Sequence, residues 1–388
     1  MLANSRALRA ILVATAALLS STLSTLAGDN DDVLKDKHTV TTIASTVPAN
    51  GDVNPYGVAQ VLQTVGNLTA GHILVSNFNN SSNAQGTGTT IVDVAPNGSV
   101  GLFAQINAGA LPGPCPGGVG LTTALVVLRS GWVIVGSLPT ADGTSATAQA
   151  GCLIVLDSTG NPVETFFGSL INGPWDMTGF DQGNHASLFV TNVLNGTVAA
   201  NGTVVNQGTV VRINLGVSTK TMPWIESMTV VGSGFSERTD PAALVIGPTG
   251  VGLSPNCSAS DPDDCVAGSG SQGEPVLYVA DTLNNRIAVI PHAITRSDSA
   301  GTGATLTTGG SLNGPLGLTV AEGGHILTVN GNDGFITEIT PQGAQIAKRL
   351  LDNSGTPPGS GALFGLIFEP GRGVIFVDDA TNTLNLLN

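Results

Sequence analysis

Six short apolar phrases recur along this chain, and their spacing constrains the fold more than any other feature of the sequence. Each phrase holds three or four large apolar residues and closes on a small polar one. The closing residues are separated by 60, 55, 89, 49 and 49 positions, and the phrases are HILVSN, WVIVGS, SLFVTN, VLYVAD, HILTVN and VIFVDD. Such a run is typical of a buried strand that enters a turn.

Each apolar phrase lies between two further elements that recur with it. A glycine-containing phrase precedes it, with the clearest copies at 54–59, 172–177, 246–251 and 313–318, and a third apolar run follows it. One such unit cannot bury both faces of its small sheet, whereas six units round an axis bury each sheet against its neighbours. The sequence therefore predicts an all-β fold, a six-bladed β-propeller with four-stranded blades.

The N-terminal part of the chain supplies a strand that has no unit of its own. The last unit reaches only its third strand at Asn388, while the run HTVTTIAST at 38–46 precedes the first unit. An open ring would leave an unpaired strand edge, which is an aggregation hazard. We therefore predict that residues 38–46 complete the sixth blade and close the ring.

Residues 1–27 have the pattern of a signal peptide. Arg6 and Arg9 precede the apolar run AILVATAALL, and small residues precede a cleavage point before Gly28. The apolar run is too short to span a bilayer. We expect a secreted or periplasmic monomer without membrane insertion, in which residues 28–388 form a single propeller domain.

The formal net charge of −14 limits the partners of the chain. Lys and Arg contribute 13 residues, against 27 from Asp and Glu. A nucleic-acid binder needs a basic surface to meet phosphates, so we expect no nucleic-acid partner. An unknown protein, or a small-molecule or glycan ligand, is the kind of partner that this composition leaves open.

Four cysteines follow the predicted cleavage point, namely Cys115, Cys152, Cys257 and Cys265. An even number in an exported protein indicates two disulfides, for which three pairings exist. The first and third strands of a four-stranded blade are entered at the same end, so we predict the pair Cys115–Cys152. The pair Cys257–Cys265 would then close a loop within a polar insertion at about 254–274.

The segment YVADTLNNRIAVI at 278–290 resembles the NHL repeat, and the likeness extends with decreasing strength over all six units. In that repeat Asp281, Asn285 and Arg286 match the residues that tie the turn between the second and third strands. The first unit also resembles the opening of a family of uncharacterised exported bacterial propellers. The resemblance implies the propeller fold and leaves function open, because such propellers include scaffolds, ligand binders, lactonases and lyases.

The motifs of several enzyme classes are missing from the sequence. It has no GxSxG nucleophile elbow, no GxxxxGK phosphate loop and no HExxH zinc motif. His72, His185 and His325 lie near the starts of second strands in different units, so we expect them to lie too far apart to share a metal ion. The run DPDD at 261–264 offers carboxylates for Ca²⁺ without EF-hand ligand order, and we interpret it as a solvated acidic loop.

One position in the glycine-containing phrases departs from the pattern, because the third unit has Asp176 where the others have glycine. The aligned series is Gly57, Gly120, Asp176, Gly250, Gly317 and Gly365. These phrases are expected to surround one mouth of the central channel. The candidate ligand-binding residues at this mouth are Asn54, Tyr56, Asn172, Trp175, Asp176 and Asn313.

Two interpretations of this mouth follow from the residues. Propellers similar to gluconolactonases hold a divalent ion near such a place with Glu, Asn and Asp ligands, which makes Asp176 a candidate ligand for Ca²⁺, although no matching Glu is evident. Alternatively, Asp176 caps a turn and the aromatic residues plug the channel. Because no catalytic constellation is present, we interpret the protein as a binding or interaction module acting through this mouth. The alternative is a Ca²⁺-dependent hydrolase, lactonase or lyase with its site at the same mouth.

Overall fold

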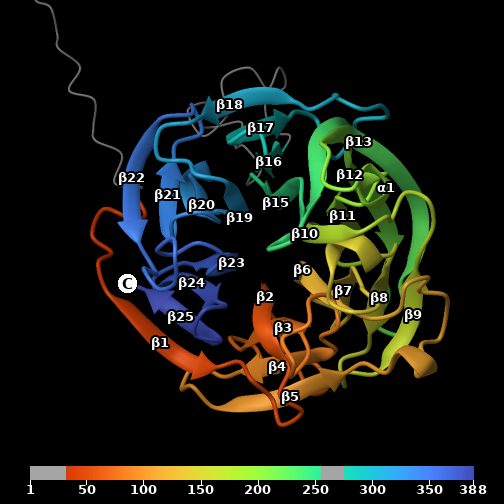
Figure 1. The fold of residues 1–388 in the computed structure, drawn as a ribbon. Helices are drawn as coiled ribbons and strands as arrows, with labels where there is room; N and C mark the ends of the chain where they lie inside the picture. Colours follow the sequence, from red (N-terminus) through yellow and green to blue (C-terminus); the bar gives the residue numbers. More distant parts are fainter. Residues whose placement is uncertain (1–31, 255–274) are drawn as a thin grey trace, which may run out of the picture. The chain divides into compact units, whose positions relative to one another are not determined.

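The computed structural model describes residues 32–254 and 275–388, which form six antiparallel sheets round a central axis (Figure 1). All six sheets belong to one compact unit that comprises Asp31–Asn388. The all-β, six-bladed fold that the repeats predict is confirmed. The predicted signal peptide and the predicted pair Cys257–Cys265 lie outside the described residues.

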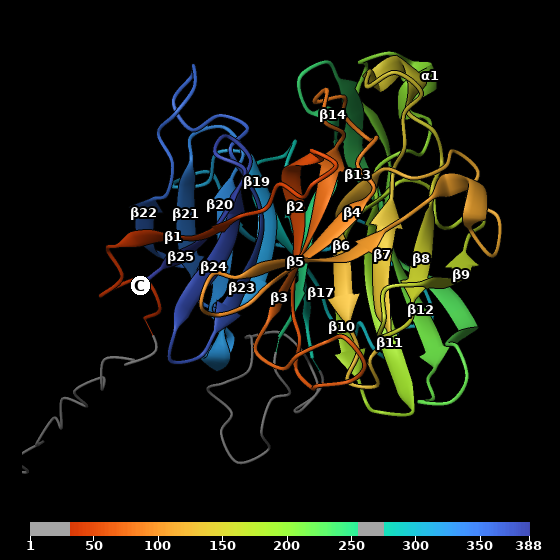
Figure 2. The same ribbon diagram turned by 90° about the horizontal axis from the view of Figure 1, so that it is seen from below.

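Within each blade the four strands follow one another from the axis outward (Figures 1 and 2). The innermost strands are β2 (Val53–Gln60), β6 (Leu121–Val127), β10 (Pro174–Asp181), β15 (Pro248–Leu253), β19 (Pro315–Val320) and β23 (Leu363–Glu369). The second strands are β3 (Ile73–Asn79), β7 (Val133–Ser137), β11 (His185–Asn192), β16 (Leu277–Asp281), β20 (Ile326–Asn330) and β24 (Gly373–Asp378).

The third strands are β4 (Thr90–Val94), β8 (Cys152–Leu156), β12 (Val205–Gly216), β17 (Arg286–Ile290), β21 (Phe335–Ile339) and β25 (Thr383–Leu387). The outer strands are β5 (Val100–Gln105), β9 (Pro162–Phe166), β13 (Trp224–Asp240), β18 (Ala304–Thr308), β22 (Gln345–Leu350) and β1 (Val40–Ser45). Blade 3 adds a fifth strand, β14 (Leu244–Ile246), and the helix α1 (Thr197–Ala200) is a single turn. Within the described ranges, no helix has the length and apolar character needed to cross a bilayer.

The apolar phrases of the sequence form the second strands. Nearly every residue in these strands is buried, on both faces of the blade. Because a second strand is covered on both sides, its sequence is a continuous apolar run rather than an alternation of apolar and polar residues.

The glycine-containing phrases form the innermost strands, where neighbouring blades approach one another most closely. A Cβ atom on Gly317 would collide with the carbonyl oxygen of Phe364, and a Cβ atom on Gly365 would collide with that of Tyr56. Glycine is therefore required at these positions by contact between backbones.

The sixth blade is closed by a strand from the N-terminal part of the chain, as predicted. β1 pairs antiparallel with β25, from Val40 opposite Leu387 to Ser45 opposite Thr383. The strand is slightly shorter than the predicted range 38–46. The backbone N–H of Thr39 also donates to the carbonyl oxygen of Asn388 at 2.9 Å, which extends the pairing beyond the strand.

The residues before β1 bind to blade 5. The backbone N–H groups of Val33 and Leu34 donate to the Glu338 carboxylate at 2.7 and 2.8 Å, and Nδ1 of His325 lies 2.6 Å from the same carboxylate. Leu34 is fully buried in a core shared by blades 5 and 6. Burial raises the pKa of Glu338, but the hydrogen bonds from His325, Leu34 and Val33 outweigh it and hold the pKa below its ordinary value.

Two local predictions within the blades are also met. Cys115 and Cys152 form a disulfide with Cα atoms 5.1 Å apart, because the loop before β6 and the start of β8 lie at the same end of blade 2. In blade 4, Nε of Arg286 lies 2.8 Å from the Asp281 carboxylate. This ion pair is the turn-tying contact that the resemblance implied.

Candidate functional site

Tyr56 and Trp175, two of the predicted ligand-binding residues, lie in a dense aromatic cluster at one end of the channel. The ring of Tyr56 stacks on those of Phe364 and Phe78, with centroids 3.9 and 4.4 Å apart. Trp175 lies 6.3 Å from Tyr56, and all four side chains are buried. The space beside them is about 10 Å³, which suits a single water molecule at most. A ligand at this mouth would therefore have to lie outside the aromatic cluster.

The predicted asparagines bind to nearby turns on three different blades. The backbone N–H of Asn54 donates to the Asn382 side chain at 2.8 Å. Nδ2 of Asn172 donates to a backbone carbonyl of its own blade at 3.2 Å, and Nδ2 of Asn313 donates to Asp333 at 3.1 Å. The structure thus brings the two aromatic residues together and leaves the asparagines apart. The role of these residues in ligand binding stays a prediction.

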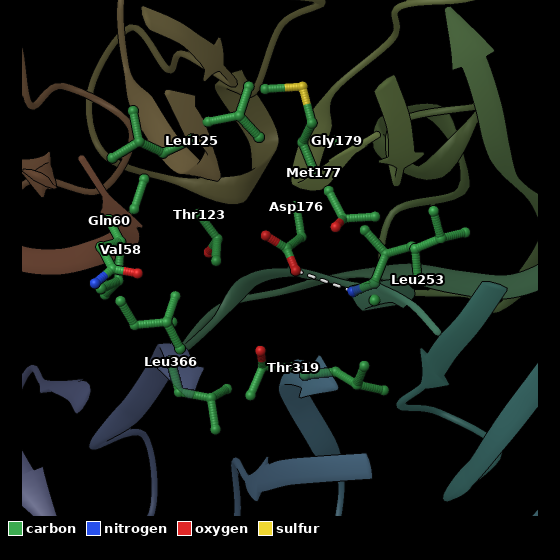
Figure 3. Close-up of a pocket in the computed structure, with 18 of the residues that line it drawn as sticks. Val58, Gln60, Thr123, Leu125, Asp176, Met177, Gly179, Leu253, Thr319 and Leu366 are labelled. Atoms are coloured by element: carbon green, nitrogen blue, oxygen red, sulfur yellow. Dashed lines mark hydrogen bonds between the residues drawn. The ribbon is translucent and has the colours of Figure 1, made fainter. Parts of the chain in front are cut away.

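Asp176 faces away from the aromatic cluster and lines a pocket of about 280 Å³ in the central channel (Figure 3). All six innermost strands contribute to this pocket. Its lining residues follow the aromatic cluster along these strands, toward their C-terminal ends. The pocket therefore belongs to the opposite mouth from the one that the sequence pattern indicated.

The wall of the pocket combines polar and apolar groups. Each innermost strand contributes one apolar side chain at the same place in its register with the second strand of its blade. These residues are Val58, Leu125, Met177, Val251, Leu318 and Leu366. A ring of this kind favours the apolar part of a small molecule.

The carboxyl group of Asp176 lies at the floor of this pocket. Its Oδ2 atom accepts a hydrogen bond from the N–H of Val251 at 3.0 Å, and the N–H of Met177 donates to the same carboxyl group. Burial raises the pKa of Asp176 to about 8, because the two hydrogen bonds offset only part of the loss of hydration. At neutral pH the group therefore holds a proton that it can exchange within the physiological range.

Thr123 presents a second polar side chain at the floor. The residue is 4 % exposed, and its hydroxyl group has no hydrogen-bond partner among the described residues. Thr123 and Asp176 lie on neighbouring blades, and both point into the centre of the pocket (Figure 3). The hydroxyl oxygen of Thr123 is shielded by neighbouring atoms, so a ligand or water in the pocket would meet it after rotation of the side chain about its Cα–Cβ bond.

Thr123, and not Gly120, is the counterpart of Asp176 in blade 2, which corrects the aligned series. Leu121 pairs with Ser137 as Pro174 pairs with the last residue of β11, so the residue two places on is Thr123. The bulge between Leu121 and Leu125 contains one residue more than the bulges of the other innermost strands. Because of this extra residue, alignment of the sequences alone does not show that Thr123 corresponds to Asp176. The sequence signal was the pair of threonines in GLTTALVV.

The ionisable side chains that line the described part of the pocket are Asp176 at the floor and Asp181 near the outer end of β10. Both are acids. Oδ2 of Asp181 accepts the backbone N–H of Arg129 at 2.7 Å. Beyond the pocket wall, Arg372 and Glu369 pair with each other at 3.0 Å. No basic side chain is among these lining residues, so the pocket holds no positive counter-charge for Asp176.

The histidines stay on separate blades, as predicted, and each binds a carboxylate of its own blade. The pairs are His72–Asp93, His185–Glu226 and His325–Glu338, with distances of 3.0, 3.3 and 2.6 Å. Asp32 joins the last pair, with ligand atoms of the three residues within 4.8 Å of one another. Glu338 already accepts the N–H groups of two backbone residues there, which suits an anchor for the N-terminal segment rather than a cation site.

Comparison with known proteins identifies the fold. No protein-family model matches the chain, and no curated protein matches it. Similar solved structures include a gluconolactonase from Xanthomonas campestris, with 13 % identity over 92 % of this chain and 90 % of that chain and a TM-score of 0.54. A second is the calcium-binding protein regucalcin from Agrobacterium tumefaciens, with 15 % identity over 88 % and 92 % of the two chains and a TM-score of 0.52.

A third is a luciferin-regenerating enzyme, with 11 % identity over 89 % of this chain and 94 % of that chain and a TM-score of 0.53. The chain is therefore a six-bladed β-propeller whose structural neighbours include a gluconolactonase and a regucalcin. At these identities the likeness concerns the fold. The resemblance to the NHL repeat stays a prediction.

A Ca²⁺ ion, which the name of one neighbour suggests, does not fit the residues that line the pocket. Ca²⁺ takes six to eight oxygen ligands, several of them from carboxylates. The floor offers the hydroxyl group of Thr123 and the carboxyl group of Asp176, which already accepts two backbone N–H groups. The other polar side chains of the described wall are those of Gln60, Thr178 and Thr319, with Asp181 near the outer end. We therefore derive no step through a metal ion at this place.

Proposed function

We propose that the central pocket is the active site of a hydrolase or lyase that moves a proton at a small organic substrate. The observation that carries this proposal is Asp176, a buried acid that faces the central pocket, where no basic side chain of the described lining pairs with it. Its pKa of about 8 lies near neutrality, where a carboxyl group both gives and takes a proton effectively. The packing of the blades does not require an acid here, because four other inner strands have glycine at this position.

Asp176 and Thr123 have different roles in the proposed reaction. Asp176 carries the proton and, at pH 7, donates it to an oxygen atom of the substrate. The hydroxyl group of Thr123 lies on the neighbouring blade and supplies a second hydrogen bond to the substrate's polar group. In a hydrolysis, water that enters through the mouth of the pocket attacks the carbonyl carbon, the ring C–O bond breaks, the Asp176 proton goes to the leaving oxygen, and the attacking water returns a proton to Asp176.

The fold neighbours suggest which reaction to test first. One of them is described as a gluconolactonase, so lactone hydrolysis is the natural first assay. Wild-type protein is incubated with sugar lactones and with apolar γ- and δ-lactones, and the released acid is titrated. We expect turnover that declines as the pH rises through about 8, because the protonated form of Asp176 is the active one.

Asp176→Asn preserves the size of the side chain and removes the exchangeable acid, so we expect kcat/KM to fall roughly 100-fold or more. Asp181→Asn, which alters an acid near the outer end of the same strand, is the matched control and should retain most activity. Lactone turnover that survives Asp176→Asn unchanged would contradict the assignment of the active site.

A second candidate function is a binding module without turnover. It is favoured by the small number of polar groups at the floor, because the described lining contains no pair of nucleophile and base. Ligand binding that Asp176→Asn weakens, in a protein that converts none of the compounds bound, would support this candidate. The partner would then be a small molecule or the end of a glycan, since the pocket is too small for a folded protein.

A further inference from the structure

We propose that the central pocket accepts a protonated amine with a compact apolar body, with the ammonium group paired to Asp176. This inference rests on the second candidate of the proposed function, a binding module, because an Asp176 that pairs with an ammonium group has given up the proton that the hydrolase requires. The charges of the lining residues support it. The ionisable side chains of the described lining are two acids, and Asp176 has no cationic partner.

A buried carboxylate without a counter-charge is unfavourable, and a cation that enters the pocket removes this penalty. The two backbone N–H groups that bind Asp176 already favour its ionised form. They do not suffice alone, because they are neutral dipoles. An ammonium group next to the carboxyl group supplies the missing positive charge and allows Asp176 to release its proton.

The position of Thr123 fits the same ligand. An ammonium group has three N–H donors, of which one meets Asp176. The hydroxyl oxygen of Thr123, which no described residue satisfies, is an acceptor for a second donor on the neighbouring blade. A carboxylate or phosphate ligand has no basic side chain to pair with among the described lining residues.

The wall sets the shape of the remainder of the ligand. Six apolar side chains from six blades form a ring round the axis, which favours a compact ligand body with an apolar surface at this level of the pocket. A volume of about 280 Å³ admits a small cyclic or branched molecule and excludes a peptide or an oligosaccharide. Cyclohexylamine and cyclohexanol share this shape and differ in the charge that the proposal requires.

The test is calorimetric titration of the wild-type protein with cyclohexylamine, cyclohexanol and cyclohexanecarboxylate between pH 6 and 9. We expect the amine to bind at least about 10-fold more tightly than the alcohol at pH 8. Its affinity should rise about tenfold per pH unit between pH 6 and 8, because binding the ammonium form releases the Asp176 proton. Titrations in buffers of different ionisation enthalpy should show about one proton released per amine bound at pH 6.5.

Variants separate the roles of the two floor residues. Asp176→Asn should abolish both the preference for the amine and the release of the proton. Thr123→Val should weaken amine binding about fivefold, whereas Thr123→Ser should retain it. Asp181→Asn should change amine affinity less than twofold.

Equal binding of alcohol and amine, stronger binding of the carboxylate, or amine binding that Asp176→Asn leaves unchanged would each overturn the inference. Absence of amine binding would overturn it as well. The proposed active site would survive these results if Asp176→Asn still removed turnover of a neutral lactone. Failure of the amine proposal can therefore be distinguished from failure of the proposed active site.

Discussion

At the residue scale, Asp176 and Glu237 are two buried carboxyl groups with different surroundings. Asp176 faces the pocket, and a ligand there can compensate for its burial. Glu237 on β13 is fully buried, and a backbone group at Asn195 interacts with it. Burial raises the pKa of each carboxyl group to about 8. Both are therefore protonated in the folded protein at pH values at which an unfolded chain has ionised them.

The difference in protonation between the folded and the unfolded chain predicts how the free energy of unfolding depends on pH. Below about pH 4 the folded and unfolded states both hold these protons, and the stabilising effect is complete. As the pH rises toward 8 the unfolded state alone loses the protons, so the free energy of unfolding decreases. Asp176→Asn and Glu237→Gln each remove one such group, and we expect each variant to lose less stability than wild type between pH 5 and 8.

Thermal unfolding at the two pH values measures this effect. Val40→Thr, which changes an exposed side chain and no ionisable group, serves as the control. If Asp176→Asn and Glu237→Gln show the same change in Tm between pH 5 and 8 as wild type, the two groups are ionised in the folded protein.

At the scale of elements, β1 is the strand on which the ring depends. It covers the edge of β25, whose residues Leu384 and Leu387 are buried between blades. Ring closure joins the sixth blade to the N-terminal part of the chain, so the first and last blades cannot separate without breaking this pairing. The anchor of Leu34 on blade 5 holds the same part of the chain at a second point.

Deletion of residues 38–46 should therefore destabilise the whole propeller. We expect a loss of about 3 kcal/mol or more, which corresponds to a fall in Tm of about 4 °C or more for a domain of this size, together with aggregation. Differential scanning calorimetry and light scattering measure the two effects. Val40→Thr, which changes an exposed side chain and retains the strand, is the control. A deletion variant that melts like wild type and stays monomeric would refute the closing role of β1.

At the scale of the whole molecule, removal of residues 1–27 stays a prediction from the sequence. The described fold begins with the segment that docks on Glu338, a few residues after the predicted cleavage point before Gly28. Cleavage there would leave both Leu34 and β1 in the mature protein. The disulfide in blade 2 agrees with an oxidising compartment.

We therefore propose export with removal of residues 1–27. Expression of the full chain in a bacterial host should give a mature protein that begins at Gly28 in the periplasm or medium. Mass spectrometry of the purified protein measures the N-terminus, and Val13→Arg, which places a charge in the apolar run, should block export. An N-terminus at Met1 in the exported fraction would contradict the prediction.

The number of blades, the closing strand and the disulfide pair are all determined by the sequence. Each of these features follows from repetition, because a chain that repeats one strand pattern six times repeats one topology six times. Once the strand order of a blade is known, the positions of Cys115 and Cys152 follow from which ends of the strands meet. The same repetition singled out Asp176 as a departure among glycines.

The identity of the open mouth and the composition of the floor were decided by the tertiary structure. The rings of Tyr56, Trp175 and Phe364 belong to three different blades, and their spacing in the sequence does not show that they meet in one cluster. Thr123 reaches the floor only because blade 2 has one extra residue in its bulge, and a shift of one residue in a strand changes which side chain faces the channel. The shape of the central pocket depends on the side-chain sizes and on the registers of six innermost strands that are far apart in the sequence. No single strand specifies the space that remains between the six.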